Sequence, residues 1–97
     1  MGKTIHTEAV DSLFDAILTL ETREECYKFF EDVCTVNEII SFAQRLEVAK
    51  MLMDGNTYLE ISEITGASTA TISRVNRSLT YGADGYKIAF DRLKEQE

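Results

Sequence analysis

The chain of 97 residues contains no proline, and its five glycines stand near the N-terminus or in three short breaks. Helices form readily in such a sequence, because proline removes a backbone donor and glycine raises the entropic cost of ordering a helix. Turn-rich β folds rarely show this pattern. The sequence therefore predicts one small domain of the all-α class, spanning residues 1–97.

Basic side chains are also scarce, since ten Lys and Arg stand against seventeen Asp and Glu, for a net charge of −7. This balance argues against a generally basic nucleic-acid coat and against binding to an anionic membrane. A hydrophobic content of 44% excludes a disordered acidic tail. No apolar run approaches the roughly 18 residues of a membrane span, and residues 1–10 lack the apolar core of a signal peptide. We expect a cytoplasmic protein with no membrane partner.

Histidine and cysteine are rare as well. His6 is the one histidine and precedes the first expected helix, so no Cys/His or Ser/His/Asp site can be assembled, and no zinc spacing or glycine-rich phosphate loop is present. The sequence therefore predicts neither an enzyme nor a metal site. On one helix Cys26 and Cys34 would lie about 12 Å apart, too far for a disulfide. We expect two buried thiols that pack as small apolar residues.

Capping sequences mark the starts of helices. The Thr-x-x-Glu pattern of a capping box occurs three times, at residues 22–25, 35–38 and 57–60, and Ser68 and Asp84 can cap two further helices. The apolar spacing between these caps is helical. Together they predict six helices, near residues 7–20, 23–33, 36–54, 58–64, 69–80 and 85–95.

The third segment, from about Val36 to Met53, is apolar on too many sides for a surface helix of a small monomer. One face would carry Ile39, Ala43, Leu46, Ala49 and Met53, and other faces carry Ile40, Val48, Met51 and Leu52. This pattern predicts burial against more than one neighbour, including a second subunit.

The stretch YLEISEITGASTATISRVNRSL, residues 58–79, has the pattern of two short helices joined by a tight turn. Gly66 can supply the left-handed conformation that such a turn requires. Apolar side chains expected at the elbow are Ile61 and Ile64 before the turn, and Ala67, Ile72 and Val75 after it. The small Ser62 lets the helices approach. Spacing alone admits both a helix-turn-helix and an ordinary αα-hairpin.

Charge favours the helix-turn-helix that reads DNA. Residues 64–83 contain no acidic side chain; residues 1–63 carry a net charge of −8 and residues 64–97 a net charge of +1. Small hydroxyl and methyl groups permit close approach to base edges, and arginine reaches guanine or phosphate. The predicted DNA-binding residues are Ser68, Thr69, Ala70, Thr71, Ser73, Arg74 and Arg77. The alternatives are a solvated helix start and arginines that only increase solubility.

The turn and second helix, GASTATISRVNRSL, resemble the corresponding segment of the tryptophan-repressor (Trp repressor) family. The similarity runs from Thr35 to Leu79 without an obvious gap, and Arg45 and the Met53-Asp54-Gly55 sequence have counterparts. The resemblance implies a six-helix Trp-repressor-like fold in an interlocked homodimer. Residues 1–54 would supply the dimerisation helices, residues 57–80 the helix-turn-helix, and residues 84–97 a C-terminal packing helix.

By the same resemblance, the protein is a sequence-specific DNA-binding transcription regulator, by expectation a repressor. Its two reading helices would enter the major groove about 34 Å apart on a palindromic operator. Thr69, Ala70 and Ser73 occupy the positions that face bases. The first helix of the motif departs from the family because it presents Tyr58, Leu59 and Ser62, with Glu63 adjacent. Phosphate affinity should therefore be weaker or redistributed towards Arg77.

The resemblance also implies a site for a small-molecule co-repressor. Thr35, Arg45, Arg74 and Ser78 stand at its positions, but Val75 replaces a glycine of the family. Its two methyl groups would fill part of the pocket, which predicts weak or no binding of L-tryptophan.

One further interpretation stays open at this point: a protein-interaction or dimerisation adaptor on a helix-turn-helix scaffold that does not bind DNA. The net charge of −7 favours the adaptor, and the absence of acidic residues from the second helix opposes it.

Overall fold

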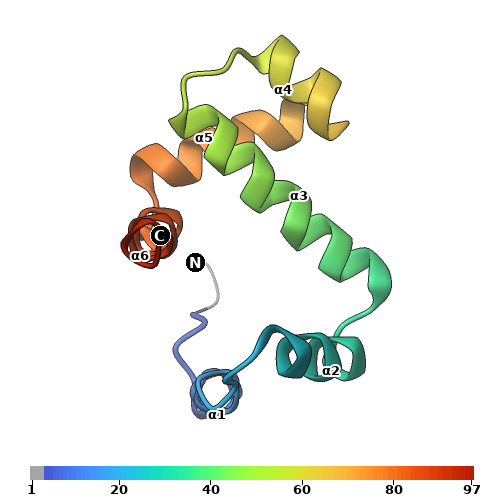
Figure 1. Cartoon of the computed structure of the whole chain (residues 1–97), viewed down its shortest axis with the longest axis vertical. Helices are drawn as coiled ribbons and strands as arrows, with labels where there is room; N and C mark the ends of the chain where they lie inside the picture. Colours follow the sequence, from blue (N-terminus) through green and yellow to red (C-terminus); the bar gives the residue numbers. More distant parts are fainter. Residues whose placement is uncertain (1–3) are drawn as a thin grey trace. The chain divides into compact units, whose positions relative to one another are not determined.

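The computed structural model describes residues 4–97, which form six helices and no strand (Figure 1). The helices are α1 (Glu8–Ile17), α2 (Arg23–Val33), α3 (Val36–Met53), α4 (Tyr58–Thr65), α5 (Thr69–Tyr81) and α6 (Gly85–Glu95). The all-α class is confirmed. The first helix is shorter than the predicted 7–20, because the amides of Thr19 and Leu20 bond three residues back, which tightens the chain into a turn. The first three residues of the predicted 1–54 segment lie outside the described range.

Side-chain caps begin α1, α2, α4 and α5. The hydroxyls of Thr7, Thr22, Thr57 and Ser68 each accept a hydrogen bond from the amide three residues on. At Thr57 the capping box is complete, since the Glu60 carboxylate accepts from the Thr57 amide at 2.8 Å. This reciprocal pairing satisfies two amides that the helix itself leaves without partners.

Two predicted caps differ in detail. The Glu25 carboxylate accepts from the amide of Glu21, one residue before the Thr22 cap, so that box is shifted. Asp84 precedes α6 as predicted, but its side chain makes no capping bond because its backbone is left-handed, with φ of 64°. An N-cap normally has an extended backbone, which points the side chain at the first turn.

The chain divides into two compact units, residues 4–36 and 37–97 as described. In the first unit, α1 and α2 contain no fully buried residue. The rings of Phe29 and Phe30 meet edge to face with centroids 5.4 Å apart. Cys26 is exposed and Cys34 half-buried, both as free thiols, so the prediction of two buried thiols is wrong. Two short helices offer too little partner surface to enclose a side chain.

The second unit holds the core, which lies at the junction of α3, α4 and α5. Its buried residues are Val48, Ala49, Ile61, Ala67, Ile72 and Val75. Half-buried apolar residues from α6, Tyr86 and Phe90, pack against it. The helix-turn-helix segment is therefore the best-packed part of the described chain.

Much of the apolar surface of α3 stays uncovered in the single chain. Val36, Ile40 and Phe42 are exposed, and so are Leu46 and Met53, which the sequence pattern placed on a buried face. Within the second unit, Leu46 and Met53 line a groove of about 790 Å³ together with Phe90 and Leu93 of α6. None of the helices formed by residues 4–97 has both the length and the apolar character needed to cross a bilayer.

Candidate nucleic-acid interface

The turn between α4 and α5 is set by a left-handed glycine. Gly66 has φ of 75°, as predicted, and its amide bonds to the Ser62 carbonyl at 2.9 Å. The Thr65 hydroxyl donates to the Ile61 carbonyl at 2.7 Å and accepts from the Ala67 amide at 3.1 Å. These bonds fix the direction in which α5 leaves α4.

Four of the five apolar residues expected at the elbow are buried there, namely Ile61, Ala67, Ile72 and Val75. The fifth, Ile64, is 67% exposed, so its predicted position in the core is wrong. Ile64 lies three residues after Ile61, near the C-terminal end of the eight-residue helix α4. Its side chain is rotated about 60° from that of Ile61, which takes it out of the core.

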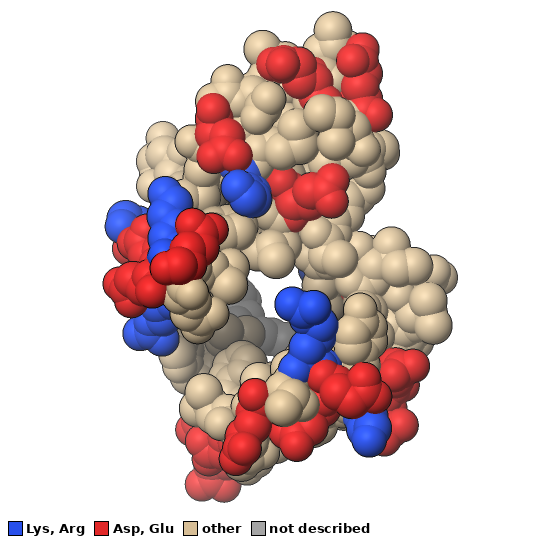
Figure 2. Space-filling view, viewed as in Figure 1, with Lys and Arg blue, Asp and Glu red and all other residues tan. Residues whose placement is uncertain are grey.

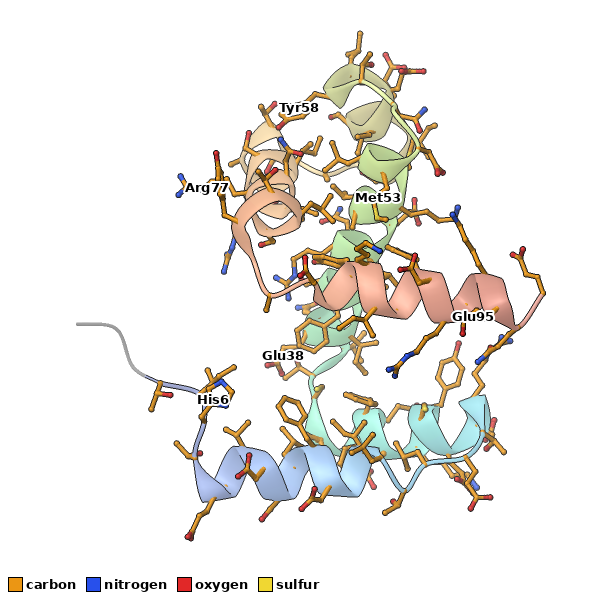
Figure 3. All side chains as sticks on the ribbon, turned by 90° about the vertical axis from the view of Figure 1, so that its left-hand side faces the viewer. His6, Glu38, Met53, Tyr58, Arg77 and Glu95 are labelled. Carbon is orange, nitrogen blue, oxygen red and sulfur yellow. The ribbon has the colours of Figure 1, made fainter. Side chains whose placement is uncertain are left out.

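The buried residues also determine which face of α5 meets solvent. Ile72 and Val75 turn one face into the core, and Leu79 continues that face half-buried. Thr69, Ala70 and Arg74 are exposed, and Ser73 is half-buried. Arg77 extends from α5 away from α3 (Figure 3).

Two of the predicted DNA-binding hydroxyls are joined to each other in the cap. Ser68 Oγ accepts from the Thr71 amide and donates to Thr71 Oγ1, both at 3.1 Å. These side chains shape the start of α5. Thr69 and Ala70 follow directly in the first turn and point their small side chains into solvent.

The two arginines of α5 take no part in the ion pairs of the described residues. The ion pairs found among residues 4–97 are Lys50–Asp54 and Lys87–Asp91, and neither involves Arg74 or Arg77. Figure 2 shows acidic side chains over α1 and α2 and also over α6 and towards α4. Of the six helices, α5 is the one without an acidic residue, so the acid-free stretch of the sequence corresponds to this helix.

The residues predicted to bind a co-repressor are divided between the two units, with Arg45, Arg74 and Ser78 in the second. Arg45, half-buried, places its guanidinium carbon 5.2 Å from the centre of the Phe42 ring. Ser78 donates to the Arg74 carbonyl at 3.3 Å and lines a hollow of about 210 Å³ at the start of α6. Thr35 belongs to the first unit.

Val75 is 1% exposed and is part of the main core cluster. Its methyl groups therefore lie in the core that α3, α4 and α5 share, where they fill space that a glycine would leave empty.

The outer surface of α4 offers little that binds phosphate. Leu59 is 69% exposed, Glu63 is exposed, and Ser62 is half-buried. Among the exposed side chains of α5 that the sequence prediction omits is that of Tyr81, which is 82% exposed. Its spacing of four residues from Arg77 is the signal that could have identified it.

Comparison with known proteins matches nearly the whole chain. The family described as Trp repressor protein matches residues 8–94. The uncharacterized protein YerC of Bacillus subtilis (strain 168) is 64% identical over 88 residues, which cover 91% of this chain and 85% of that protein. A TrpR-like protein from Eubacterium eligens has a crystal structure with a TM-score of 0.90, at 64% identity and 93% of each chain. The crystal structure of a proposed Trp repressor from Staphylococcus aureus gives a TM-score of 0.90, at 58% identity and 96% of each chain.

Proposed function

Because this chain belongs to the Trp repressor protein family, we propose that it is a cytoplasmic transcription regulator that binds a specific DNA sequence and acts as a repressor. The family assignment confirms the resemblance seen in the turn and second helix. The family is one of regulators, and the proposal includes no catalytic role.

The observation that carries the proposal is the exposed start of α5, set on a packed core and free of acidic side chains. In this proposal α5 enters the major groove with its N-terminal end towards the bases. Thr69, Ala70 and Ser73 approach base edges, where methyl groups contact thymine and hydroxyls contact either partner of a pair. Arg74 reaches guanine or a phosphate. Ser68 and Thr71 hold the helix start in position.

We further propose that the active form is a homodimer of one Trp-repressor-like domain, residues 1–97. Its support is apolar surface that one chain leaves in water, including Val36 at 71% and Ile40 at 60% exposure. The first unit, which holds α1 and α2 without a buried side chain, gains a core only from a partner surface. Residues 1–54 would interlock with a second copy, and residues 84–97 would pack beside them. Two copies of α5 would then read a palindromic site.

Arg45, Arg74 and Ser78, with Thr35 of the first unit, remain the proposed contacts for a small-molecule co-repressor. L-Tryptophan should bind weakly or not at all, because Val75 replaces the family's glycine directly after Arg74 and adds two methyl groups at that position. Calorimetric titration of the purified protein checks this, and micromolar affinity for L-tryptophan would contradict it.

The decisive test is a mobility-shift assay of the purified protein on fragments of its own genome, at two salt concentrations. We expect a shift that weakens steeply with salt and disappears when Arg74→Ala and Arg77→Ala are combined. Circular dichroism must show that the double variant stays helical. Sedimentation equilibrium tests the dimer in the same samples.

An adaptor that binds protein rather than DNA is the second candidate. The exposed Leu59 and Ile64 on α4 and the net charge of −7 favour it. Absence of any shift at low salt, with or without added small molecules, would support the adaptor and refute the regulator.

A further inference from the structure

The outward face of α5 is longer than the part that the proposed function uses. Ala70, Arg74, Arg77 and Tyr81 are spaced by three or four residues, so they lie along one side of the helix. All four are exposed, and this side is opposite the buried Ile72 and Val75. The stripe runs about 16 Å along the helix axis, from the first turn to the last.

The two ends of this stripe differ in chemistry. Its N-terminal end carries small side chains, which suit close approach to bases. Its C-terminal end carries Arg77, with no ion-pair partner among the described residues, and the long, exposed side chain of Tyr81. Both side chains are several ångströms long and carry a hydrogen-bond donor at the tip.

Neighbouring hydroxyls on the same part of α5 are already engaged. Ser78 donates to the carbonyl of Arg74 at 3.3 Å, and Thr80 donates to the carbonyl of Asn76 at 3.0 Å. The hydroxyl protons of Ser78 and Thr80 are therefore already used in hydrogen bonds within α5. Arg77 and Tyr81 are therefore the side-chain donors of the stripe in this half of α5, while the exposed amide of Asn76 lies about 100° around the helix from Arg77.

The end of α5 is held in place by Gly82. A side chain at this position would collide with the carbonyl oxygen of Ser78, and the Gly82 amide bonds to that same oxygen at 2.9 Å. This close approach keeps the last turn of α5 wound up to Tyr81, so that Tyr81 stays in register with Arg77.

We infer that Arg77 and Tyr81 bind phosphate oxygens of the DNA strand that borders the groove read by the first turn of α5. The inference rests on the proposed DNA-binding function. A helix that enters the groove by its N-terminal end brings its last turns to the groove edge, where the sugar-phosphate backbone lies. Guanidinium pairs with phosphate through two parallel hydrogen bonds, and a tyrosine hydroxyl supplies a third. α4 presents Leu59, Glu63 and the hydroxyl of Tyr58 but no Lys or Arg, so it offers no cation that could replace Arg77.

The test measures binding constants by fluorescence anisotropy over a series of salt concentrations. The probes are a duplex cut from the fragment that shifts most strongly and a mixed-sequence duplex of the same length. For Arg77→Ala we expect the slope of log K against log salt to fall by about 0.9 per chain, or about twice that per dimer. Affinity should fall by a similar factor for both duplexes, so that their ratio is unchanged.

Two companion variants sharpen the result. Tyr81→Phe removes one hydroxyl and no charge, so affinity should fall severalfold for both duplexes without a change of slope. Arg92→Ala removes the same charge as Arg77→Ala from an exposed position on α6 and should leave the slope at the wild-type value.

The inference is overturned if Arg77→Ala has the slope of Arg92→Ala, if it abolishes the preference between the duplexes, or if Tyr81→Phe binds like the wild type. In each case the wild type still binds DNA, and the proposed function stands. Failure of the wild type to bind either duplex would instead refute the proposed function itself.

Discussion

The side-chain amide of Gln44, in the middle of α3, donates a hydrogen bond of 3.2 Å to the main-chain carbonyl of Thr65, the last residue of α4. The last carbonyls of a helix have no partner within the helix. Gln44 supplies one from a neighbouring helix, and so ties the end of α4 to α3 directly before the left-handed turn at Gly66.

The first prediction concerns this bond. Gln44→Met keeps the length of the side chain and removes the donor, so the free energy of unfolding should fall by about 1 kcal/mol. Urea denaturation at a fixed protein concentration measures it, since a dimer's stability depends on concentration. Gln96→Met, at the exposed end of α6, is the matched control and should change little. Equal effects of the two substitutions would show that the Gln44 bond contributes nothing.

The second prediction separates two isoleucines of α4 that the sequence treats alike. Ile61 is fully buried, and Ile61→Ala should cost about 2–5 kcal/mol because it removes apolar contact and leaves a cavity. Ile64 is 67% exposed, and Ile64→Ala should cost less than about 1 kcal/mol. Thermal unfolding of both variants measures the difference. A loss at Ile64 as large as that at Ile61 would mean that a partner covers Ile64.

The third prediction compares two glycines. Gly66 has a left-handed backbone, so Gly66→Ala should destabilise the protein by about 1–2 kcal/mol, although nothing lies within 4 Å of the added carbon. Gly85 begins α6, also with open space around it. Gly85→Ala should be neutral or stabilise by up to about 1 kcal/mol, since alanine favours the helix. Chemical denaturation of both variants in the same buffer measures these effects. A neutral Gly66→Ala substitution would contradict this interpretation.

The fourth prediction concerns pH. The Thr57 amide, which donates a hydrogen bond to the Glu60 carboxylate, lowers the pKa of Glu60. A carboxyl whose pKa is lower in the folded state stabilises the fold above its unfolded pKa, about 4.3 for glutamate. The stabilisation is lost as the pH falls through the folded value. We expect the pKa of the Glu60 carboxyl, followed by NMR, to lie below the value usual for glutamate, and Thr57→Val should remove the hydroxyl's share of this shift.

Local signals in the sequence were sufficient to place the helices. Threonine or serine caps, the apolar spacing and the glycine at position 66 act over three or four residues, and the helix starts follow them closely. The deviations occur at helix starts where the backbone differs from the geometry that the capping patterns assume. Asp84 precedes α6 but adopts a left-handed conformation, and the box at Thr22 is shifted to the amide of Glu21.

The candidate site was predictable to a similar degree. The residues proposed to bind DNA follow each other from Ser68 to Arg77, so one helix start brings them together once the turn is recognised. Their contacts with DNA remain a prediction. The sequence did not indicate that Ser68 and Thr71 bond to each other, because that depends on the direction in which each side chain leaves α5. The sequence prediction also omitted Tyr81, although its spacing of four residues from Arg77 places it on the outward side of the helix.

By itself, the sequence determined the all-α class, the position of the turn at Gly66 and the separation of acidic from basic segments, because each depends on residues that are neighbours along the chain. The tertiary structure alone decided that Ile61 is buried while Ile64 is exposed, that Cys26 faces solvent, and that Gln44 supports the end of α4. These outcomes depend on which helix covers which face. That choice is made by packing between segments far apart in the chain, where residue spacing carries no information.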